Sequence, residues 1–103
     1  MNTVYIVMPA YNEETNIKDV VQTWYPVLEG KSRDSKLVIA DSGSTDATHS
    51  ILTAMQEEYP GLKILSETAK QHGPKLIALY QYAIDQGAEF VFQTDSDGQT
   101  SPD

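Results

Sequence analysis

The sequence feature best suited to chemistry is a pair of carboxylates that follows an apolar run. Residues 90–92 are aromatic and β-branched, which predicts a short buried strand that ends in turn residues. Side chains two residues apart in an extended chain point to the same side, so Asp95, Asp97 and Gln99 can offer three oxygen ligands to one point beyond this strand. Oxygen ligands suit Mg²⁺ or Mn²⁺ rather than zinc. The alternative is a solvated acidic turn.

The composition limits the classes of partner and chemistry. The chain has 103 residues, enough for one domain with its own core, and 15 acidic residues against 7 basic ones give a formal net charge of −8. This charge argues against nucleic acid or an anionic membrane as the main partner. The absence of cysteine excludes disulfides, thiol catalysis and zinc–thiolate sites. Because no signal peptide or membrane-spanning stretch is apparent, we expect a cytoplasmic protein, with membrane association in a full-length form left open.

Four apolar runs predict strands, and the segments between them have helical periodicity. Continuous apolar runs are typical of strands buried on both faces, as in parallel sheets. We expect Pro9 to stop the first strand, Lys63 to mark the third as an edge strand, and Gly87 to follow the last helix. The predicted strands are residues 4–8, 37–40, 62–65 and 90–92.

The helices are predicted from apolar residues that recur on one face. The first has Asn12 or Thr15 as its N-cap and ends or kinks near Tyr25, because Pro26 follows. The second helix is predicted to end at Pro60-Gly61, and its buried face is predicted to contain Ala47, Ile51, Met55 and Tyr59. The third is predicted to begin at Gly73-Pro74, with a buried face of Leu76, Leu79, Tyr80 and Ala83.

The alternation β-α-β-α-β-α-β predicts the fold class. It implies a mostly parallel sheet with right-handed crossovers and helices on both faces, that is, a three-layer α/β sandwich. Such folds bind ligands beyond the carboxyl ends of the strands, where the strand order switches. Polar loops follow three of the predicted strands, at residues 9–13, 41–44 and 95–99. Because the sequence stops soon after the third loop, we expect residues 1–103 to be one part of a longer protein.

Familiar nucleotide-binding motifs are missing from these loops. No glycine lies between the first predicted strand and the first helix, which excludes a dinucleotide-binding Rossmann fingerprint and a P-loop. A phosphoacceptor receiver domain would have its acids after the first and third strands, whereas here they follow the second and fourth. His49 and His72 have no second ligand at a metal-binding spacing and are predicted to be surface residues.

Taken together, the three loops resemble the family 2 glycosyltransferases of the GT-A fold. Residues 9–17 match the P-A-Y-N-E-E-x-N-I part of that family's opening motif. Residues 41–48 are similar to D-D-G-S-T-D-x-T, with Ser42 in place of the second Asp. Residues 94–99 resemble the D-x-D segment, and Gln99 makes the polyprenyl- and dolichyl-phosphate sugar synthases the most similar subgroup. The resemblance extends over the whole chain.

This resemblance implies a nucleotide-diphospho-sugar transferase (GT-A) fold, which is Rossmann-like, and a nucleotide-sugar donor such as a UDP- or GDP-sugar. Tyr11 would offer an aromatic face to the base or ribose, Glu13 would accept hydrogen bonds from the nucleoside, and Asp41 would bind the base. Loop packing and helix capping are the alternative roles. The implied nucleotide-binding residues are Pro9, Tyr11, Glu13, Ile39, Asp41, Asp95 and Ser96.

The resemblance also implies Mg²⁺ or Mn²⁺ bound by Asp95, Asp97 and Gln99. One carboxylate about 4 Å from a phosphate charge costs roughly 4 kcal/mol at an effective dielectric of about 20, so the loop would repel a bare diphosphate. A metal reverses the sign and stabilises the departing nucleotide. The general base for inverting transfer to an acceptor hydroxyl or phosphate is expected beyond residue 103. No catalytic residue is therefore assigned within the chain, which is expected to bind the donor without transferring its sugar.

Other functions remain open. A sugar nucleotidyltransferase would require a glycine-rich loop after the first strand, where this chain has Pro9-Ala10-Tyr11. A non-catalytic nucleotide-binding or assembly module would keep the fold and lose the metal site. The apolar run at residues 90–92 also predicts self-association of the chain, if it forms an exposed edge of the sheet.

Overall fold

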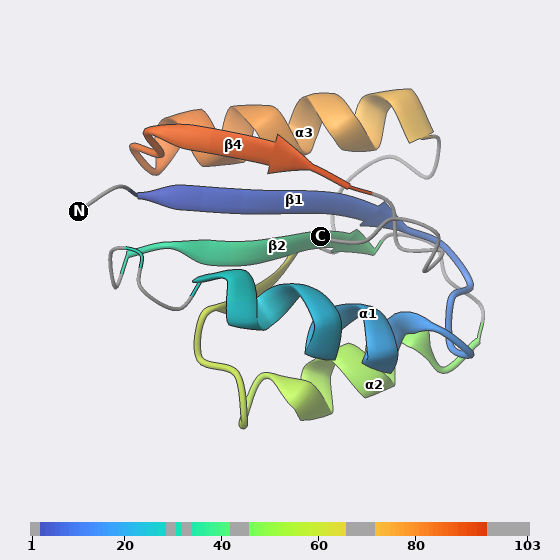
Figure 1. Ribbon diagram of the computed structural model, residues 1–103. Helices are drawn as coiled ribbons and strands as arrows, with labels where there is room; N and C mark the ends of the chain where they lie inside the picture. Colours follow the sequence, from blue (N-terminus) through green and yellow to red (C-terminus); the bar gives the residue numbers. More distant parts are fainter. Residues whose placement is uncertain (1–2, 29–30, 32–33, 42–45, 66–71, 95–103) are drawn as a thin grey trace.

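The computed structural model describes residues 3–28, 31, 34–41, 46–65 and 72–94 and confirms the α/β class. Its elements are β1 (Val4–Ala10), α1 (Ile17–Trp24), the 3₁₀ helix η1 (Tyr25–Leu28), β2 (Lys36–Asp41), α2 (Thr48–Met55), β3 (Leu62–Leu65), α3 (His72–Asp85) and β4 (Phe90–Gln93). The four strands form a parallel sheet with the order β3-β2-β1-β4. Helices α1 and α2 lie on one face and α3 lies on the other, which makes three layers (Figure 1).

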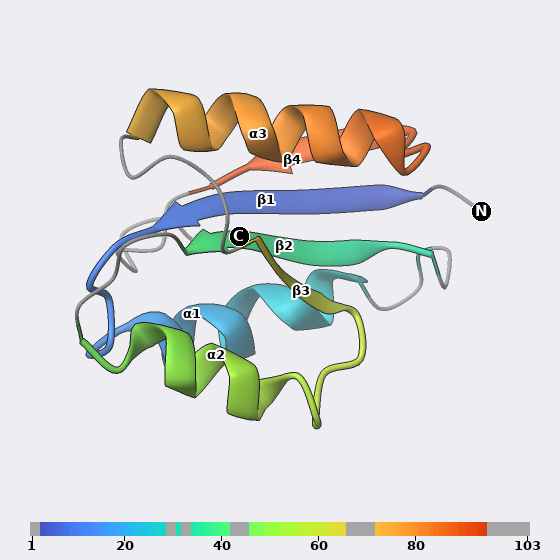
Figure 2. The ribbon, with the colours of Figure 1, turned by 180° about the vertical axis from the view of Figure 1, so that it is seen from behind.

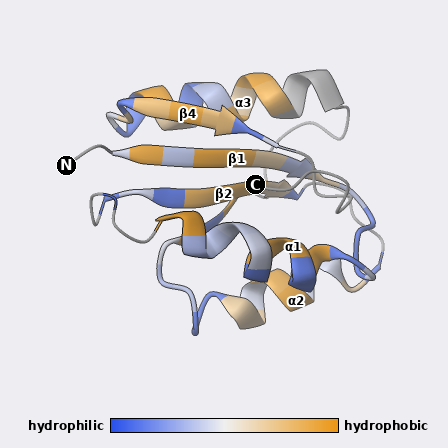
Figure 3. Cartoon of the chain, viewed as in Figure 1, coloured by the Kyte–Doolittle hydropathy of each residue, from blue (hydrophilic) through white to orange (hydrophobic). Residues whose placement is uncertain are grey.

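The sheet is built around β1, which lies between β2 and β4. Alternate side chains of a strand point to opposite faces. Val4, Ile6 and Met8 pack in the core beneath α1 and α2, whereas Tyr5 and Val7 pack beneath α3. Burial on both faces explains the continuous apolar run in this strand. Figure 2 shows α3 from the other side, and Figure 3 shows that apolar residues concentrate along the strands.

Strand β1 extends through Pro9, so the prediction that this proline stops the strand is wrong. The Thr94 amide donates to the Val7 carbonyl at 3.0 Å, so the polar backbone groups of Val7 face β4. Because these groups alternate in direction along a strand, those of residue 9 face the same side as those of Val7. Pairing with β4 ends at Val7, whereas pairing with β2 continues to Ala10. A proline at position 9 therefore removes no hydrogen bond from the strand pairing that the described residues form.

Helix α1 ends just before Pro26, as predicted, and the chain tightens into η1. The predicted N-caps are wrong, because Asn16, rather than Asn12 or Thr15, occupies the cap position and its side chain makes no cap bond. The Glu13 carbonyl instead accepts hydrogen bonds from the Asn16 amide at 2.9 Å and from the next amide at 2.8 Å. The loop after β1 thus satisfies the start of the helix with its own backbone.

Helix α2 is shorter than predicted, and its predicted buried face is confirmed in part. Met55 is buried and Ile51 packs half-buried against the core, whereas Ala47, assigned to the buried face from the sequence, is exposed. Thr48 and Leu52 are buried in addition. The helix ends before the predicted stop at Pro60-Gly61. The ring of Tyr59 packs on that of Tyr25 with centroids 4.7 Å apart, which holds the chain after the helix against η1.

Helix α3 ends at Asp85, and Gly87 follows it, as predicted. Gly87 has a φ of 83°, a conformation that favours glycine, and its amide donates to the Ile84 carbonyl at 3.0 Å. The predicted burial of Leu79 and Ala83 is confirmed, but Tyr80 is 37% exposed. The buried face of α3 is therefore narrower than the sequence pattern indicated.

Strand β4 is an edge strand within the described part of the chain, not the buried strand that was predicted. Phe90 is 47% exposed and Phe92 is 57% exposed. Among the described strands, β4 pairs only with β1, so its second edge is not covered by them. The prediction that β3 lies at an edge is confirmed.

Candidate functional site

The carboxyl ends of β1, β2 and β4 lie at one end of the sheet, where the predicted site loops begin (Figure 1). Ala10 pairs with Asp41, so the loops after β1 and β2 start side by side. The strand order switches at β1, because β2 and β3 extend the sheet to one side and β4 lies on the other. Open α/β sheets bind their ligands at such a switch point.

The predicted nucleotide-binding residues on the strands are buried, and those on the loop are accessible. Pro9 and Ile39 are buried, and Ile39 belongs to the core beneath α1 and α2. Tyr11 is 48% exposed and Glu13 is half-buried. Tyr11 and Glu13 are therefore accessible to a ligand, whereas Pro9 and Ile39 lie beneath the surface at this end of the sheet.

Asp41 is the buried acid at this end of the sheet. Its side chain is fully buried, and its Oδ2 lies 3.4 Å from Nδ1 of His49, in the first turn of α2. The side chain of His49 is 53% exposed, which agrees with its predicted surface position. Its carboxylate partner was not predicted from the sequence. A signal was available, because the end of a strand and the first turn of the following helix lie close together in a βα unit.

A set of hydrogen bonds, termed the Asp46 bridge (Glu13, Glu14, Asp46, Ala47 and Thr48), joins the loop after β1 to the start of α2. Asp46 Oδ1 accepts from the Thr48 amide at 2.9 Å and from the Thr48 hydroxyl. That hydroxyl accepts from the Glu13 amide at 2.8 Å. Asp46 Oδ2 accepts from the Glu14 amide at 3.2 Å, and Glu14 Oε2 accepts from the Ala47 amide at 3.3 Å. The bridge holds Glu13 at a fixed place relative to α2.

The same hydrogen bonds set the charge of Asp46. Partial desolvation raises the pKa of Asp46, but hydrogen bonds from the Thr48 side chain and amide and from the Glu14 amide lower it by more. The pKa of this carboxyl therefore lies below its ordinary value, and the group is ionised at neutral pH. Its oxygens are used within the bridge, and Oδ1 accepts from the amide of Thr48, the first residue of α2, whose N-cap residue is Ala47.

The predicted metal ligands Asp95, Asp97 and Gln99, together with Ser96, lie outside the described residues. In the part that is described, no three His, Asp or Glu side chains are grouped to hold a metal ion. Strand β4 does lead to the switch point, because the Thr94 amide donates to a β1 carbonyl at 3.0 Å. The carboxylate and amide oxygens that follow Thr94 in the sequence suit a hard divalent ion.

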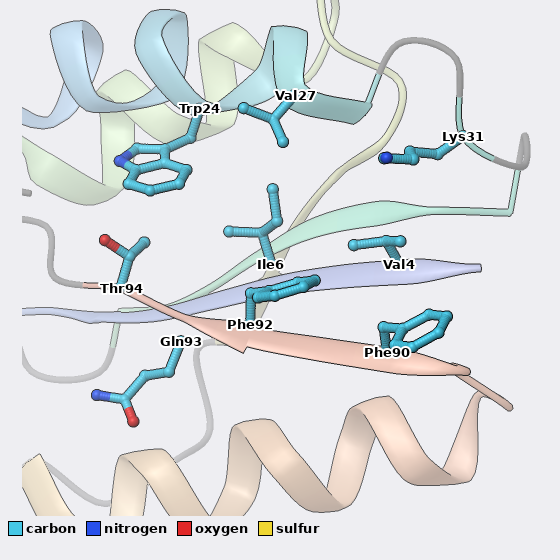
Figure 4. A pocket seen from close by; sticks show the side chains of 9 residues that line it. All are labelled: Val4, Ile6, Trp24, Val27, Lys31, Phe90, Phe92, Gln93 and Thr94. Carbon is cyan, nitrogen blue, oxygen red and sulfur yellow. The ribbon is translucent and has the colours of Figure 1, made fainter. Parts of the chain in front are cut away.

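An apolar groove of about 410 Å³ lies between the α1–η1 layer and β4 (Figure 4). Trp24 and Val27 point from this layer toward the sheet, and Gln93 points away toward α3, where its Oε1 accepts from the Tyr80 hydroxyl at 3.2 Å. Polar groups are few, so the groove offers no chemistry comparable to that at the strand ends. It is lined by Val4, Ile6, Trp24, Val27, Lys31, Phe90, Phe92, Gln93 and Thr94.

Solved structures with this arrangement are nucleotide-sugar transferases of the GT-A fold. The chain resembles a mannosyltransferase from Pyrobaculum calidifontis, solved with GDP-Man and Mn²⁺, with a TM-score of 0.76 and 30% identity over 91% of this chain and 27% of that one. It also resembles glucosyl-3-phosphoglycerate synthase from Mycobacterium tuberculosis, solved with UDP, with a TM-score of 0.69 and 27% identity over 93% of this chain and 34% of that one. Another structure of the latter enzyme contains Mn²⁺, UDP and phosphoglyceric acid. The predicted fold type is confirmed.

The chain belongs to glycosyl transferase family 2, whose family model matches residues 5–103. It is 32% identical over 113 residues to a UDP-N-acetylglucosamine–dolichyl-phosphate N-acetylglucosaminyltransferase from Methanococcus voltae, covering 97% of this chain and 43% of that protein. It is 26% identical to a dolichyl-phosphate beta-glucosyltransferase from Dictyostelium discoideum, covering 92% of this chain and 31% of that protein. The family resemblance found in the sequence is confirmed.

The chain spans less than half the length of these relatives. The aligned share is 43% of the Methanococcus voltae protein and 27% of the Pyrobaculum calidifontis structure.

Among the described residues, no helix has both the length and the apolar character needed to cross a bilayer.

Proposed function

We propose that residues 1–103 form the donor-binding part of an inverting glycosyltransferase that moves a sugar from a nucleotide diphosphate to an acceptor hydroxyl or phosphate. The observation that carries this proposal is the pairing of Ala10 with Asp41, which brings the two family motifs after β1 and β2 together at the switch point. The relatives named above support a nucleotide-sugar donor.

The accessible and buried groups of the site have different roles in this proposal. Tyr11, with its exposed ring, stacks on the base or ribose of the donor, and Glu13 accepts from nucleoside hydroxyls. Asp41 accepts a hydrogen bond from the base. Pro9 and Ile39 form the floor of the pocket, and Asp95 and Ser96 complete it on the side of β4.

A divalent ion is part of the proposal, with Asp95, Asp97 and Gln99 as its protein ligands. Their oxygens match the preference of Mg²⁺ and Mn²⁺. The ion supplies positive charge to the diphosphate and to the departing nucleotide, which the acidic loop by itself would repel. The neighbour structures that contain Mn²⁺ are in keeping with this assignment.

Calorimetric titration with UDP and GDP tests the donor site. The native chain is expected to bind one of them, and Asp41→Asn is expected to weaken that binding about tenfold, which corresponds to roughly 1.4 kcal/mol for one hydrogen bond to a charged group. Equal affinity of the native and Asp41→Asn chains would contradict the role of Asp41. Sugar transfer by the 103-residue chain alone at ordinary enzyme rates would contradict the proposal that the general base lies beyond residue 103.

A mode of self-association and a cellular location go with this function. Because Phe90 and Phe92 are exposed at the edge of the sheet, we propose that the chain self-associates through β4 when no further chain covers it. Cytoplasmic placement, with membrane association arising from a lipid acceptor or from further regions of a full-length protein, is proposed from the usual location of nucleotide sugars.

A non-catalytic nucleotide-binding module is the second candidate. The fold and the nucleoside contacts would be the same, and only the metal dependence would differ. Nucleotide affinity that is unchanged by Mn²⁺ would favour this candidate over the glycosyltransferase.

A further inference from the structure

The contact between His49 and Asp41 links an exposed imidazole to a fully buried carboxylate. Nδ1 lies 3.4 Å from Oδ2, and the two side chains are 53% and 0% exposed. We propose that His49 is a positioning residue that holds Asp41 as a hydrogen-bond acceptor for the base of the donor, provided that the site binds a nucleotide as proposed above. His49 itself need not touch the ligand.

The backbone of His49 is held on both sides, which fixes the point on α2 from which its side chain extends. Thr48, the preceding residue, is anchored in the Asp46 bridge, and the Thr53 hydroxyl donates to the His49 carbonyl at 2.9 Å. The other acids at this end of α2, Asp46 and Glu14, are engaged with backbone amides of the bridge. Among the residues that the structure describes, the imidazole therefore has one carboxylate partner at close range, Asp41.

The pair also defines which nitrogen of the ring carries hydrogen. A distance of 3.4 Å is longer than a typical hydrogen bond, so the attraction is mainly electrostatic. A buried carboxylate is costly unless a polar or charged partner compensates its charge. In the neutral imidazole, Nδ1 must carry the hydrogen, because a bare nitrogen would face the lone pairs of Asp41 Oδ2. His49 thereby holds the carboxylate in one orientation.

A carboxylate in a fixed orientation selects among bases by hydrogen-bond type. Uracil and guanine present an N–H on the pairing edge of the ring, and a carboxylate can accept from it. Cytosine and adenine present a bare ring nitrogen at the equivalent position, which would face the carboxylate with no hydrogen between them. Loss of the His49 contact should therefore weaken uridine or guanosine nucleotides selectively and leave phosphate binding unchanged.

Nitrogen-detected NMR of the imidazole tests the pairing without any ligand. At a pH where the ring is neutral, the native chain is expected to show His49 protonated at Nδ1, and Asp41→Asn is expected to shift the ring toward the Nε2-protonated form. An Nε2-protonated ring in the native chain would overturn the proposed orientation.

Calorimetry with UDP, GDP and pyrophosphate, each with Mn²⁺, tests the functional consequence. His49→Ala is expected to lower the affinity for the preferred nucleotide about tenfold, and His49→Asn, which places an amide N–H near the position of Nδ1, to restore it to within about threefold. Pyrophosphate affinity should be the same in all variants. Ser50→Ala is the matched control, because Ser50 is exposed in the same helical turn.

The outcomes separate the two proposals. Nucleotide binding that His49→Ala leaves unchanged, or an equal loss for pyrophosphate, would overturn the role of His49 and leave the donor site intact. Failure of the folded native chain to bind any nucleotide would overturn the donor site and, with it, the role of His49. Circular dichroism of each variant shows whether the chain remains folded.

Discussion

The Asp46 bridge predicts that one buried hydroxyl is important for the stability of the site. Thr48→Val keeps the shape of the side chain and removes the hydroxyl that accepts from the Glu13 amide at 2.8 Å and donates to Asp46 Oδ1. Thr48 is fully buried, so water cannot easily replace these bonds. The substitution leaves the Glu13 amide without its hydroxyl acceptor and removes one of the donors to Asp46.

The expected loss is about 2 kcal/mol, since each of the two hydrogen bonds contributes about 1 kcal/mol and an amide left without an acceptor adds to the cost. For a domain of this size, about 2 kcal/mol lowers the melting temperature by roughly 10 °C. Urea unfolding should show a lower midpoint with an unchanged slope, because the surface exposed on unfolding is the same.

Thr53→Val is the matched control on the same helix. The Thr53 hydroxyl donates to the His49 carbonyl at 2.9 Å but is exposed, so its removal should cost less than about 0.5 kcal/mol. A loss for Thr48→Val no larger than that for Thr53→Val would refute the structural importance assigned to the bridge.

Three further predictions concern charge, association and ligand contact. Hydrogen bonds lower the pKa of Asp46 in the folded chain, so its contribution to the free energy of unfolding is fully present above about pH 4 and is lost as the pH falls through the lowered folded-state pKa. Asp46→Asn should therefore reduce the loss of stability that urea unfolding shows between pH 5 and pH 2. Phe92→Ser should reduce concentration-dependent sedimentation, whereas Ile77→Ser, at a site on α3 that is 71% exposed, should not; equal behaviour of the two would contradict association through β4. Tyr11→Ala should change the free energy of unfolding by less than about 0.5 kcal/mol and weaken nucleotide binding about tenfold; unchanged affinity would exclude stacking on Tyr11.

Much of the fold could be predicted from the sequence because its two central strands, β1 and β2, are buried on both faces. Continuous apolar runs mark such strands without any knowledge of their neighbours, and glycine at position 87 marks the end of α3 through its own backbone conformation. The loops that carry the family motifs follow directly from the ends of these strands. Local chemistry was sufficient for these features.

The features that the sequence missed depend on contacts between distant segments. Pro9 is tolerated within β1 because the pairing with β4 has already ended there, which only the register reveals. Phe90 and Phe92 have the composition of a buried strand, but their exposure is decided by the position of β4 in the sheet. No local pattern contains this information.

The candidate site shows the same division. Tyr11 and Asp41 were identified from motifs, whereas the partner of Asp41 was not, because His49 comes from a different element. The Asp46 bridge likewise joins side chains from two loops through backbone amides, and amides leave no trace in a sequence pattern. Family motifs identify which residues belong to the candidate site, and the structure shows which hydrogen bonds and contacts fix the places of these residues.

We propose a division of labour for the longer protein. In it, the described end of the sheet supplies the nucleoside contacts, while β4 leads into the acidic segment that starts at Asp95. Donor binding and metal binding are therefore expected to be separable by mutation. A substitution at Asp97 should affect only the metal-dependent part of the affinity.

Calorimetric titration of UDP and GDP into the native chain and Asp97→Asn, each with and without Mn²⁺, tests the proposed donor site most directly. We expect one nucleotide to bind the native chain at least tenfold more tightly with Mn²⁺ than without it, a difference of about 1.4 kcal/mol, and we expect Asp97→Asn to abolish this difference. Binding that is equal with and without Mn²⁺, or a metal effect that persists in Asp97→Asn, would contradict the metal-dependent donor site. Absence of binding to the folded native chain, repeated with a longer form of the protein, would contradict nucleotide binding itself.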